Sequence, residues 1–277
     1  MTTASALRRF AWRLGRRIYC GARGEPRGGD IHADGEAAVQ ACVIAGTPAA
    51  DPLHIFDIGA NVGDWSVALF DQIGAQSGRP VHLHAFEPVG GTRTRLEEAL
   101  ARYAERFDIH IHATAISDRK GVANMHIVED GAGQNSMHDL DLGTHRTIEI
   151  ETVTLSETFD RLGVERAQLV KVDAEGHDLA IIRGALDLLA SERIDVLQFE
   201  YNHAWVYSRS FLKDIFDLTD ALPYKVARVG SERLDAFDHW HPELERFFNA
   251  NYLLIRDAAL GWFRHRRGSF DGSNTYA

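Results

Sequence analysis

The chain has 277 residues, 45% of them hydrophobic, which is enough to bury the core of one large α/β domain. Its 40 acidic residues against 30 Lys and Arg give a net charge of −10, which excludes a general electrostatic attraction to nucleic acid and favours a neutral or cationic partner. The two cysteines, Cys20 and Cys42, form neither a disulfide framework nor a zinc pattern, so a reducing cytoplasm is expected.

Residues 1–50 are predicted to be a helical extension that is basic at its start. Residues 1–28 carry seven arginines but lack the continuous apolar run of a signal peptide, and no stretch of the sequence is long enough to cross a bilayer. Apolar side chains such as Phe10, Trp12 and Ile18 lie among these arginines and indicate a basic amphipathic helix. Such a helix either rests on a membrane surface or packs on its own domain or a twin subunit, and the sequence favours packing.

Short apolar runs then alternate with longer helical patterns along residues 51–257. Strands are predicted at 53–58, 81–86, 109–113, 169–172, 196–199, 224–229 and 251–255. Helices are predicted at 64–73, 92–107, 155–162, 178–189 and 211–222. Strands separated by helices of this length predict a Rossmann-like α/β domain, with a seven-stranded, mostly parallel sheet and helices on both faces.

Two segments interrupt or follow this alternation. Residues 117–153 contain turn signals and strand-like pieces at 122–128 and 147–153, which predicts an inserted hairpin or flap. Residues 258–277 are polar and contain Gly and Ser, which is typical of a frayed C-terminal tail.

A glycine-containing loop follows the first predicted strand, where a doubly wound sheet binds its ligand. Gly59 and Gly63 allow the backbone to approach a ligand closely, but Asn61 stands where a dinucleotide fingerprint needs glycine. Asp57 would repel a phosphate and could pair with a cationic amino group, such as that of S-adenosylmethionine. The charge therefore favours the sulfonium cofactor over NAD.

The next two strand ends carry further candidates for contacts with an adenosine. Glu87 ends the second strand, and its carboxylate can accept hydrogen bonds from both ribose hydroxyls. Ile116 could offer an apolar face to the adenine ring, with Ser117 and Asp118 beside it and Asp118 accepting from the exocyclic amine. A plain type I turn over residues 117–120 explains this last segment equally well.

The sequence at this point resembles the FkbM family of methyltransferases. The resemblance lies in F-D-I-G-A-N-V-G-D at 56–64, F-E-P at 86–88, A-I-S-D at 115–118, T-L-S-E-T-F-D at 154–160, V-K-V-D-A-E-G-H-D at 170–178 and F-E-Y-N at 199–202. It covers roughly residues 53–256 and implies an S-adenosylmethionine fold that usually methylates oxygen on sugars, glycolipids or polyketides. Ala174 and Asp178 depart from the commoner Val and Glu without changing the chemistry.

The fourth strand of the predicted parallel order ends in a second group of polar residues. Asp173 lies at its carboxyl tip, where a methyl acceptor would meet the cofactor, and Glu175 and His177 follow. A base near neutrality would help a hydroxyl attack, and His177 has the unperturbed pKa that suits this task, as would a carboxyl group raised by burial. His145 is a second candidate base, reaching the site from the flap.

Metal assistance is the alternative to a base. Asp173 together with Glu200 and Asn202 offers oxygen ligands at adjacent strand tips, which suit a hard cation such as Mg²⁺. Structural explanations also exist, since Glu175 and Gly176 can start the following helix and His177 can lie on its first turn.

The sequence therefore predicts an S-adenosylmethionine-dependent O-methyltransferase acting on a sugar, oligosaccharide or glycolipid hydroxyl. A small-molecule or glycan acceptor is the expected partner, with no nucleic acid, and peripheral membrane contact and a homodimer are left open. One rival is an NAD(P)-dependent oxidoreductase or epimerase, and another is a non-catalytic nucleoside-binding scaffold.

Overall fold

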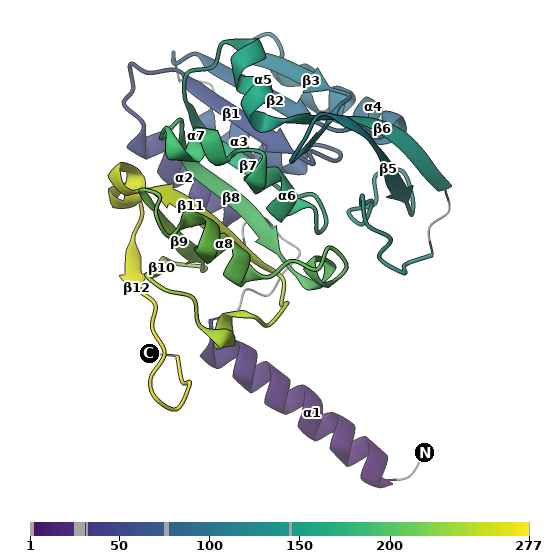
Figure 1. The fold of residues 1–277 in the computed structure, drawn as a ribbon, viewed down its shortest axis with the longest axis vertical. Coiled ribbons are helices and arrows are strands. Elements are labelled where there is room, and N and C mark those ends of the chain that lie inside the picture. The colour runs from purple at the N-terminus through teal and green to yellow at the C-terminus, as the bar shows by residue number, and fades with distance from the viewer. Residues whose placement is uncertain (1–2, 25–30, 32, 75–77, 144–145, 277) are drawn as a thin grey trace.

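The computed structural model describes residues 3–24, 31, 33–74, 78–143 and 146–276. Within these residues a nine-stranded sheet runs through the centre of the domain (Figure 1). Across the sheet the strands are β12 (His265–Arg267), β10 (Leu234–Phe237), β9 (Tyr224–Val229), β11 (Ala250–Arg256), β8 (Ile194–Tyr201), β7 (Ala167–Val172), β1 (Leu53–Ile58), β2 (Val81–Phe86) and β3 (Asp108–His112).

The seven strands from β9 to β3 form the predicted, mostly parallel sheet. Strands β8, β7, β1, β2 and β3 pair in parallel, while β11 is antiparallel to both β8 and β9. The strand count was nevertheless too low, because β10 and β12 extend the sheet beyond β9. β12 lies in the segment expected to be a frayed tail, and its three polar residues carry no apolar alternation that could have revealed it.

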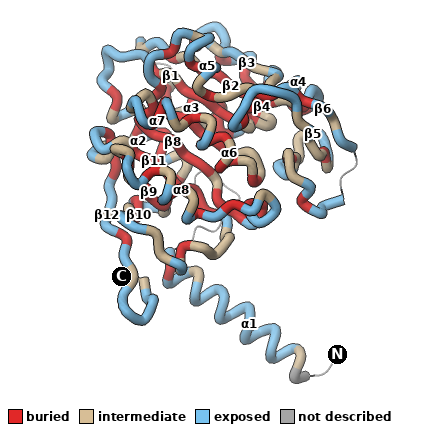
Figure 2. The backbone as a smooth tube through the Cα atoms, in the orientation of Figure 1, coloured by how far each residue is buried: buried red, intermediate tan, exposed pale blue. Residues whose placement is uncertain are grey.

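Helices cover both faces of the sheet, as expected for parallel crossovers. On one face, α5 (Leu155–Leu162), α6 (Asp178–Arg183), α7 (Leu186–Ala190) and α8 (Leu212–Thr219) form one hydrophobic core with the sheet. On the other, α2 (Glu36–Gly46), α3 (Asp64–Ile73) and α4 (Gly90–Leu100) form a second. Figure 2 shows buried residues concentrated along the sheet and the inward faces of these helices.

Three of the predicted helices differ from the bounds that their apolar patterns suggested, and α8 is one of them, since it covers 212–219 of the expected 211–222. The helix expected at 178–189 divides into α6 and α7 around Gly184, where an added Cβ would overlap the carbonyl oxygen of Ser117. The helix expected at 92–107 is α4 followed by one 3₁₀ turn at Ala101–Tyr103. At Gly184 the close approach of the Ser117 carbonyl divides the helix, and apolar spacing does not reveal such a contact.

The predicted flap is a small three-stranded sheet. β6 (Arg146–Thr154) pairs antiparallel with β5 (Gly121–Ile127) and parallel with β4 (Ala115–Ser117). β4 follows shortly after β3, an edge strand of the main sheet. The flap therefore lies beside the carboxyl edge of the main sheet (Figure 1).

The first fifty residues divide into two helices with different surroundings. α1 (Thr3–Ala22) projects away from the domain and is almost entirely exposed (Figures 1 and 2). α2, by contrast, buries Val39 and Val43 in the core shared with α3. No helix among the described residues is both long and apolar enough to cross a membrane.

Candidate active site

A cavity of about 230 Å³ lies at the carboxyl ends of β1, β2 and β7. This is the edge at which open α/β sheets bind ligands. Its walls come from the loops after these three strands, from the flap and from the segment that begins α2. They are formed by Ile31, Glu36, Gly59, Ala60, Asn61, Val62, Asp64, Trp65, Glu87, Met125, Ala132, Gly133, Asn135, Lys171, Asp173 and Glu175.

The loop after β1 makes a turn that depends on two glycines. Gly59 has φ 78° and Gly63 has φ 94°, in the left-handed region where glycine is favoured. A Cβ at position 59 would overlap the backbone carbonyl oxygen of Asp173, so the β1 and β7 loops can meet only through a glycine. Asn61 also has a positive φ, of 47°, which is a conformation that asparagine tolerates.

Asp57 is fully buried and does not line the cavity. Ser66 Oγ donates to its Oδ2 at 2.6 Å, and Lys171 Nζ lies 3.9 Å from its Oδ1. Burial raises the pKa of Asp57, and Lys171 opposes this shift. The carboxylate of Asp57 is thus tied to α3 and lies near Lys171, while its Oδ1 accepts no hydrogen bond among the described residues, and its expected pairing with a ligand amino group stays a prediction.

Glu87, at the end of β2, lines the cavity. The backbone N–H of Asn61 donates to its Oε2 at 3.1 Å and that of Val89 to its Oε1 at 2.8 Å, so Glu87 ties the first two loops together. Burial raises its pKa to about 7. Each carboxylate oxygen keeps a lone pair for a ligand hydroxyl.

Lys171 is a buried cation in the cavity wall. Its Nζ donates to Asp173 Oδ2 at 3.0 Å. Burial alone would lower its pKa, but the carboxylates of Asp173, Asp57 and Glu36 outweigh burial and raise the pKa of Lys171 above its usual range. Lys171 thus stays charged and balances part of the acidic surroundings.

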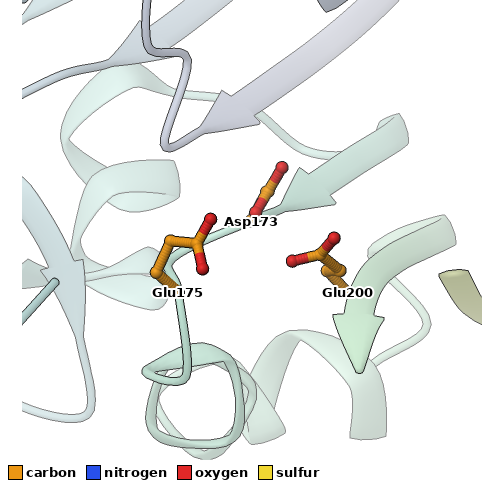
Figure 3. A group of neighbouring side chains, drawn as sticks. All are labelled: Asp173, Glu175 and Glu200. Atoms are coloured by element: carbon orange, nitrogen blue, oxygen red, sulfur yellow. The ribbon is translucent and has the colours of Figure 1, made fainter. Parts of the chain in front are cut away.

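Three carboxyl groups face one another beside Lys171, from the loop after β7 and from the end of β8 (Figure 3). One oxygen each of Asp173, Glu175 and Glu200 lies within 4.8 Å of the others. Burial, followed by the charges of Asp173 and Asp178, raises the pKa of Glu175 to about 8. Burial and the neighbouring carboxylates also raise the pKa of Glu200.

The residues proposed to hold a metal are only partly brought together. Asp173 and Glu200 meet as predicted, but Glu175 completes the group rather than Asn202. Asn202 donates from Nδ2 to Glu200 at 2.6 Å, and its Oδ1 accepts from the backbone N–H of Ala204 at 2.7 Å. Asn202 therefore positions Glu200 and starts the following 3₁₀ turn.

The His177 ring faces away from the three carboxyl groups of Asp173, Glu175 and Glu200. Its Nε2 lies 2.9 Å from Ser117 Oγ, and its Nδ1 lies 3.3 Å from His138 Nε2. Burial, then His138, lowers its pKa to about 4, so the ring is neutral at pH 7. The other expected base, His145, lies outside the described residues.

A second, apolar cavity of about 50 Å³ adjoins the first and shares Gly59, Met125, Asn135 and Asp173 with it. Ile116 and Phe86 line this slot, together with His177. Ser117 and Asp118 lie along a neighbouring groove under the flap rather than in the slot. Of the three residues expected near an adenine, the structure therefore places only Ile116 in the slot wall.

Several wall residues were not singled out by the sequence. Glu36 comes from the start of α2, and burial raises its pKa to about 7. Trp65 lies on the first turn of α3, with its Nε1 buried and unpartnered, as is Asn61 Oδ1. Spacing could have pointed to Trp65, which directly follows the glycine loop, whereas no local signal marks Glu36 because tertiary folding alone brings α2 to the cavity.

Comparison with known proteins adds the family. The family described as Methyltransferase FkbM domain matches residues 57–252. The chain belongs to the FkbM methyltransferase family. The FkbM match includes the glycine loop, Glu87 and the three carboxyl groups of the site. It also includes the seven strands of the predicted sheet, except for the beginning of β1 and the end of β11. No curated protein matches the chain.

Solved structures with a related fold include two methyltransferases. An FkbM methyltransferase from Methylobacillus flagellatus KT has 17% identity and a TM-score of 0.48, over 74% of this chain and 44% of that one. A putative O-methyltransferase from Klebsiella pneumoniae has 12% identity and a TM-score of 0.44, over 88% and 89%. The chain thus spans less than half the length of the Methylobacillus protein.

Proposed function

We propose that the chain is an S-adenosylmethionine-dependent O-methyltransferase that acts on a hydroxyl of a sugar, oligosaccharide or glycolipid. The observation that carries the proposal is the acidic cavity at the glycine turn, where Glu87 and the group of Asp173, Glu175 and Glu200 converge. The sugar class of the acceptor rests on the resemblance to the family.

The residues around the cavity fit the cofactor. Glu87 would accept from the ribose hydroxyls, and the apolar slot with Ile116 would take the adenine. The unpartnered Asn61 Oδ1 and Trp65 Nε1 offer an acceptor and a donor for the amino and carboxylate groups of the methionine part. The cofactor supplies a methyl group on a positively charged sulfur.

The charge of the cavity argues against a dinucleotide. Its wall contains five carboxyl groups, those of Glu36, Asp64, Glu87, Asp173 and Glu175. The cation in that wall, Lys171, already forms ion pairs with Asp173 and Asp57. A pyrophosphate would meet repulsion there, whereas a sulfonium and an ammonium group would be attracted.

Glu175 is the proposed general base, in preference to His177. Its carboxyl group lies in the cavity beside Asp173, whereas the His177 ring is directed to Ser117 and His138. The cofactor would supply the methyl carbon, with its sulfur leaving as a neutral thioether, and the Glu175 carboxylate would accept the proton that the acceptor hydroxyl loses. A carboxyl pKa of about 8 is well matched to this task near neutral pH.

The first test is calorimetric titration with S-adenosylmethionine and S-adenosylhomocysteine, followed by NAD(H). We expect micromolar binding of the first two and none of NAD(H). Preferential binding of NAD(H) would replace the proposal with the oxidoreductase. Binding without transfer of radiolabelled methyl to any member of a sugar and glycolipid panel would favour the scaffold.

The second test is Glu175→Gln, with the exposed Glu165→Gln as the matched control. We expect Glu175→Gln to lower kcat by about 10²- to 10⁴-fold. Cofactor affinity should change little, because Glu175 is largely protonated at pH 7 and glutamine is similar in shape. In the wild type, kcat should rise with pH up to about 8, where Glu175 loses its proton, and this rise should be absent from the variant.

A metal-assisted mechanism gives a different outcome in the same assay. Asp173, Glu175 and Glu200 present only oxygen atoms, which suits Mg²⁺. If a cation assists, a chelator should abolish transfer and added Mg²⁺ should restore it. If Glu175 acts as a base without a metal, chelation should leave kcat and its pH dependence unchanged.

A further inference from the structure

Helix α1 carries an exposed apolar stripe. Leu7, Phe10, Leu14 and Ile18 are spaced by three or four residues, which places them on one side of a helix with 3.6 residues per turn. Their exposed fractions are 69%, 63%, 46% and 62%, so the stripe is uncovered along the helix. A continuous exposed patch of this kind is typical of an interaction site.

The rest of the helix surface is strongly basic. Five arginines, at positions 8, 9, 13, 16 and 17, occupy the rest of the helix circumference, with Arg17 directly beside Phe10, and α1 contains no acidic residue. Trp12 is 75% exposed and lies among the arginines, about 140–160° around the helix from Leu7 and Phe10. Apolar and aromatic residues on one side with arginines on the other are the pattern of helices that lie in a membrane interface.

The contacts of α1 with its own domain explain why the stripe stays exposed. Tyr19 OH donates to Glu243 at 3.2 Å, and the Arg16 guanidinium lies 5.2 Å from the centre of the Phe248 ring. Arg16 and Tyr19 lie about 120–180° around the helix from Leu7. The domain thus holds the last turns of α1 by the side opposite the stripe, and packing on its own domain does not account for the apolar residues.

The distribution of charge identifies the kind of surface that would cover the stripe. The five arginines of α1 belong to a chain of net charge −10, so the remainder of the chain carries −15. An anionic lipid surface attracts α1 and repels the remainder, which orients the molecule. A second copy packed stripe to stripe would instead bring two sets of five arginines together, with a repulsive result.

The loop at 242–249, whose Glu243 and Phe248 hold α1, lies on the same edge of the sheet as the candidate active site. It precedes β11, whose first residue, Ala250, pairs with Tyr201 at the carboxyl end of β8. Glu200 is the neighbour of Tyr201 in the sequence. Helix α1 therefore leaves the domain from the sheet edge that carries the three carboxyl groups. We propose that α1 is a peripheral membrane anchor that binds an anionic lipid surface through Leu7, Phe10, Leu14 and Ile18 and the arginines beside them.

Vesicle co-sedimentation of the full chain tests this proposal independently of catalysis. The probes are phosphatidylcholine vesicles with and without one third phosphatidylglycerol. We expect binding to the anionic vesicles, at least tenfold weaker binding to pure phosphatidylcholine, and weakening when the ionic strength is raised tenfold. Equal binding to both kinds of vesicle would overturn the electrostatic part of the proposal.

Two variants separate the contributions of the stripe and the arginines. Phe10→Glu with Leu14→Glu, and Arg8→Glu with Arg13→Glu, should each lower vesicle binding at least tenfold. The control Val206→Glu adds one negative charge, half of that in the stripe variant, at an apolar residue of the domain that is 54% exposed, and it should bind like the wild type. Unchanged melting temperatures would show that all variants are folded.

The competing occupant, a second copy, gives a distinct result. If the wild type does not bind the anionic vesicles but sediments as a dimer that Phe10→Glu with Leu14→Glu dissociates, the stripe is a subunit interface and the lipid proposal fails. A wild type that neither binds vesicles nor self-associates also overturns it.

Discussion

Glu87 is the single side chain on which the proposed cofactor position most depends. It accepts from Asn61 and Val89 and keeps lone pairs toward the cavity. Glu87→Ala should weaken S-adenosylmethionine binding by roughly 2–3 kcal/mol, because a charge-assisted pair of hydrogen bonds is lost. Calorimetry measures this directly, with the exposed Glu98→Ala as the control.

Two outcomes would contradict the assigned role of Glu87. An unchanged dissociation constant would remove it from the ribose contact. A weaker affinity accompanied by a large drop in melting temperature would assign it to holding the two loops together.

Residue by residue, the sequence predicted the types of group at the site better than their contacts. Glu87, Asp173, Glu175 and Gly59 line the cavity because their positions follow directly from strand ends. The orientation of His177 toward Ser117, and the burial of Asp57 under Ser66, depend on side-chain packing between distant segments. Sequence spacing does not contain that information.

Among the elements, the turn between β1 and α3 sets how closely the two central loops approach. Gly59→Ala should destabilise folding by about 3 kcal/mol or more, because it combines a positive φ with overlap on the Asp173 carbonyl. Gly163→Ala is the matched control, since it also has a positive φ but meets no atom within 4 Å and should cost about 1 kcal/mol. Urea unfolding compares the two, and equal losses would show that the close approach is unimportant.

Element bounds followed from the sequence wherever a strong apolar period met a clear stop signal. β1, β2, α3, α5 and β9 have the predicted bounds. The errors arose where tertiary contacts decide, as at Gly184, or where an edge strand has no apolar face to reveal it, as in β12. α2 was expected only as part of an extension, although it buries Val39 and Val43 like any core helix.

For the whole molecule, a row of histidines across β2 and β3 affects stability in acid. His84 Nδ1 and His112 Nε2 lie 3.3 Å apart. Burial and the neighbouring histidines lower the pKa of His84 to about 3, while burial, then Arg161, lowers that of His112 to about 4. Below the unfolded pKa of about 6.5 the unfolded chain binds protons that the folded chain does not, so the stability contributed by these residues falls as the pH falls.

Comparison with His84→Asn isolates this contribution from that of the site carboxyl groups, whose raised pKa values act in the opposite direction. Relative to the variant, the wild type should lose about 2 kcal/mol of unfolding free energy between pH 7 and 5. Urea unfolding at both pH values measures the difference. A wild type and a variant with parallel pH dependence would show that His84 takes up a proton in the folded state.

The sheet edges have a consequence for a protein gathered on a surface. β12 is only three residues long and contains Arg266 and Arg267, and β3, at the other edge, carries Asp108 and two histidines on its five residues. Short, charged edge strands are poor templates for a further strand from another chain. Membrane anchoring through α1 would bring many copies close together on one surface. The short, charged edge strands would then prevent these copies from aggregating edge to edge.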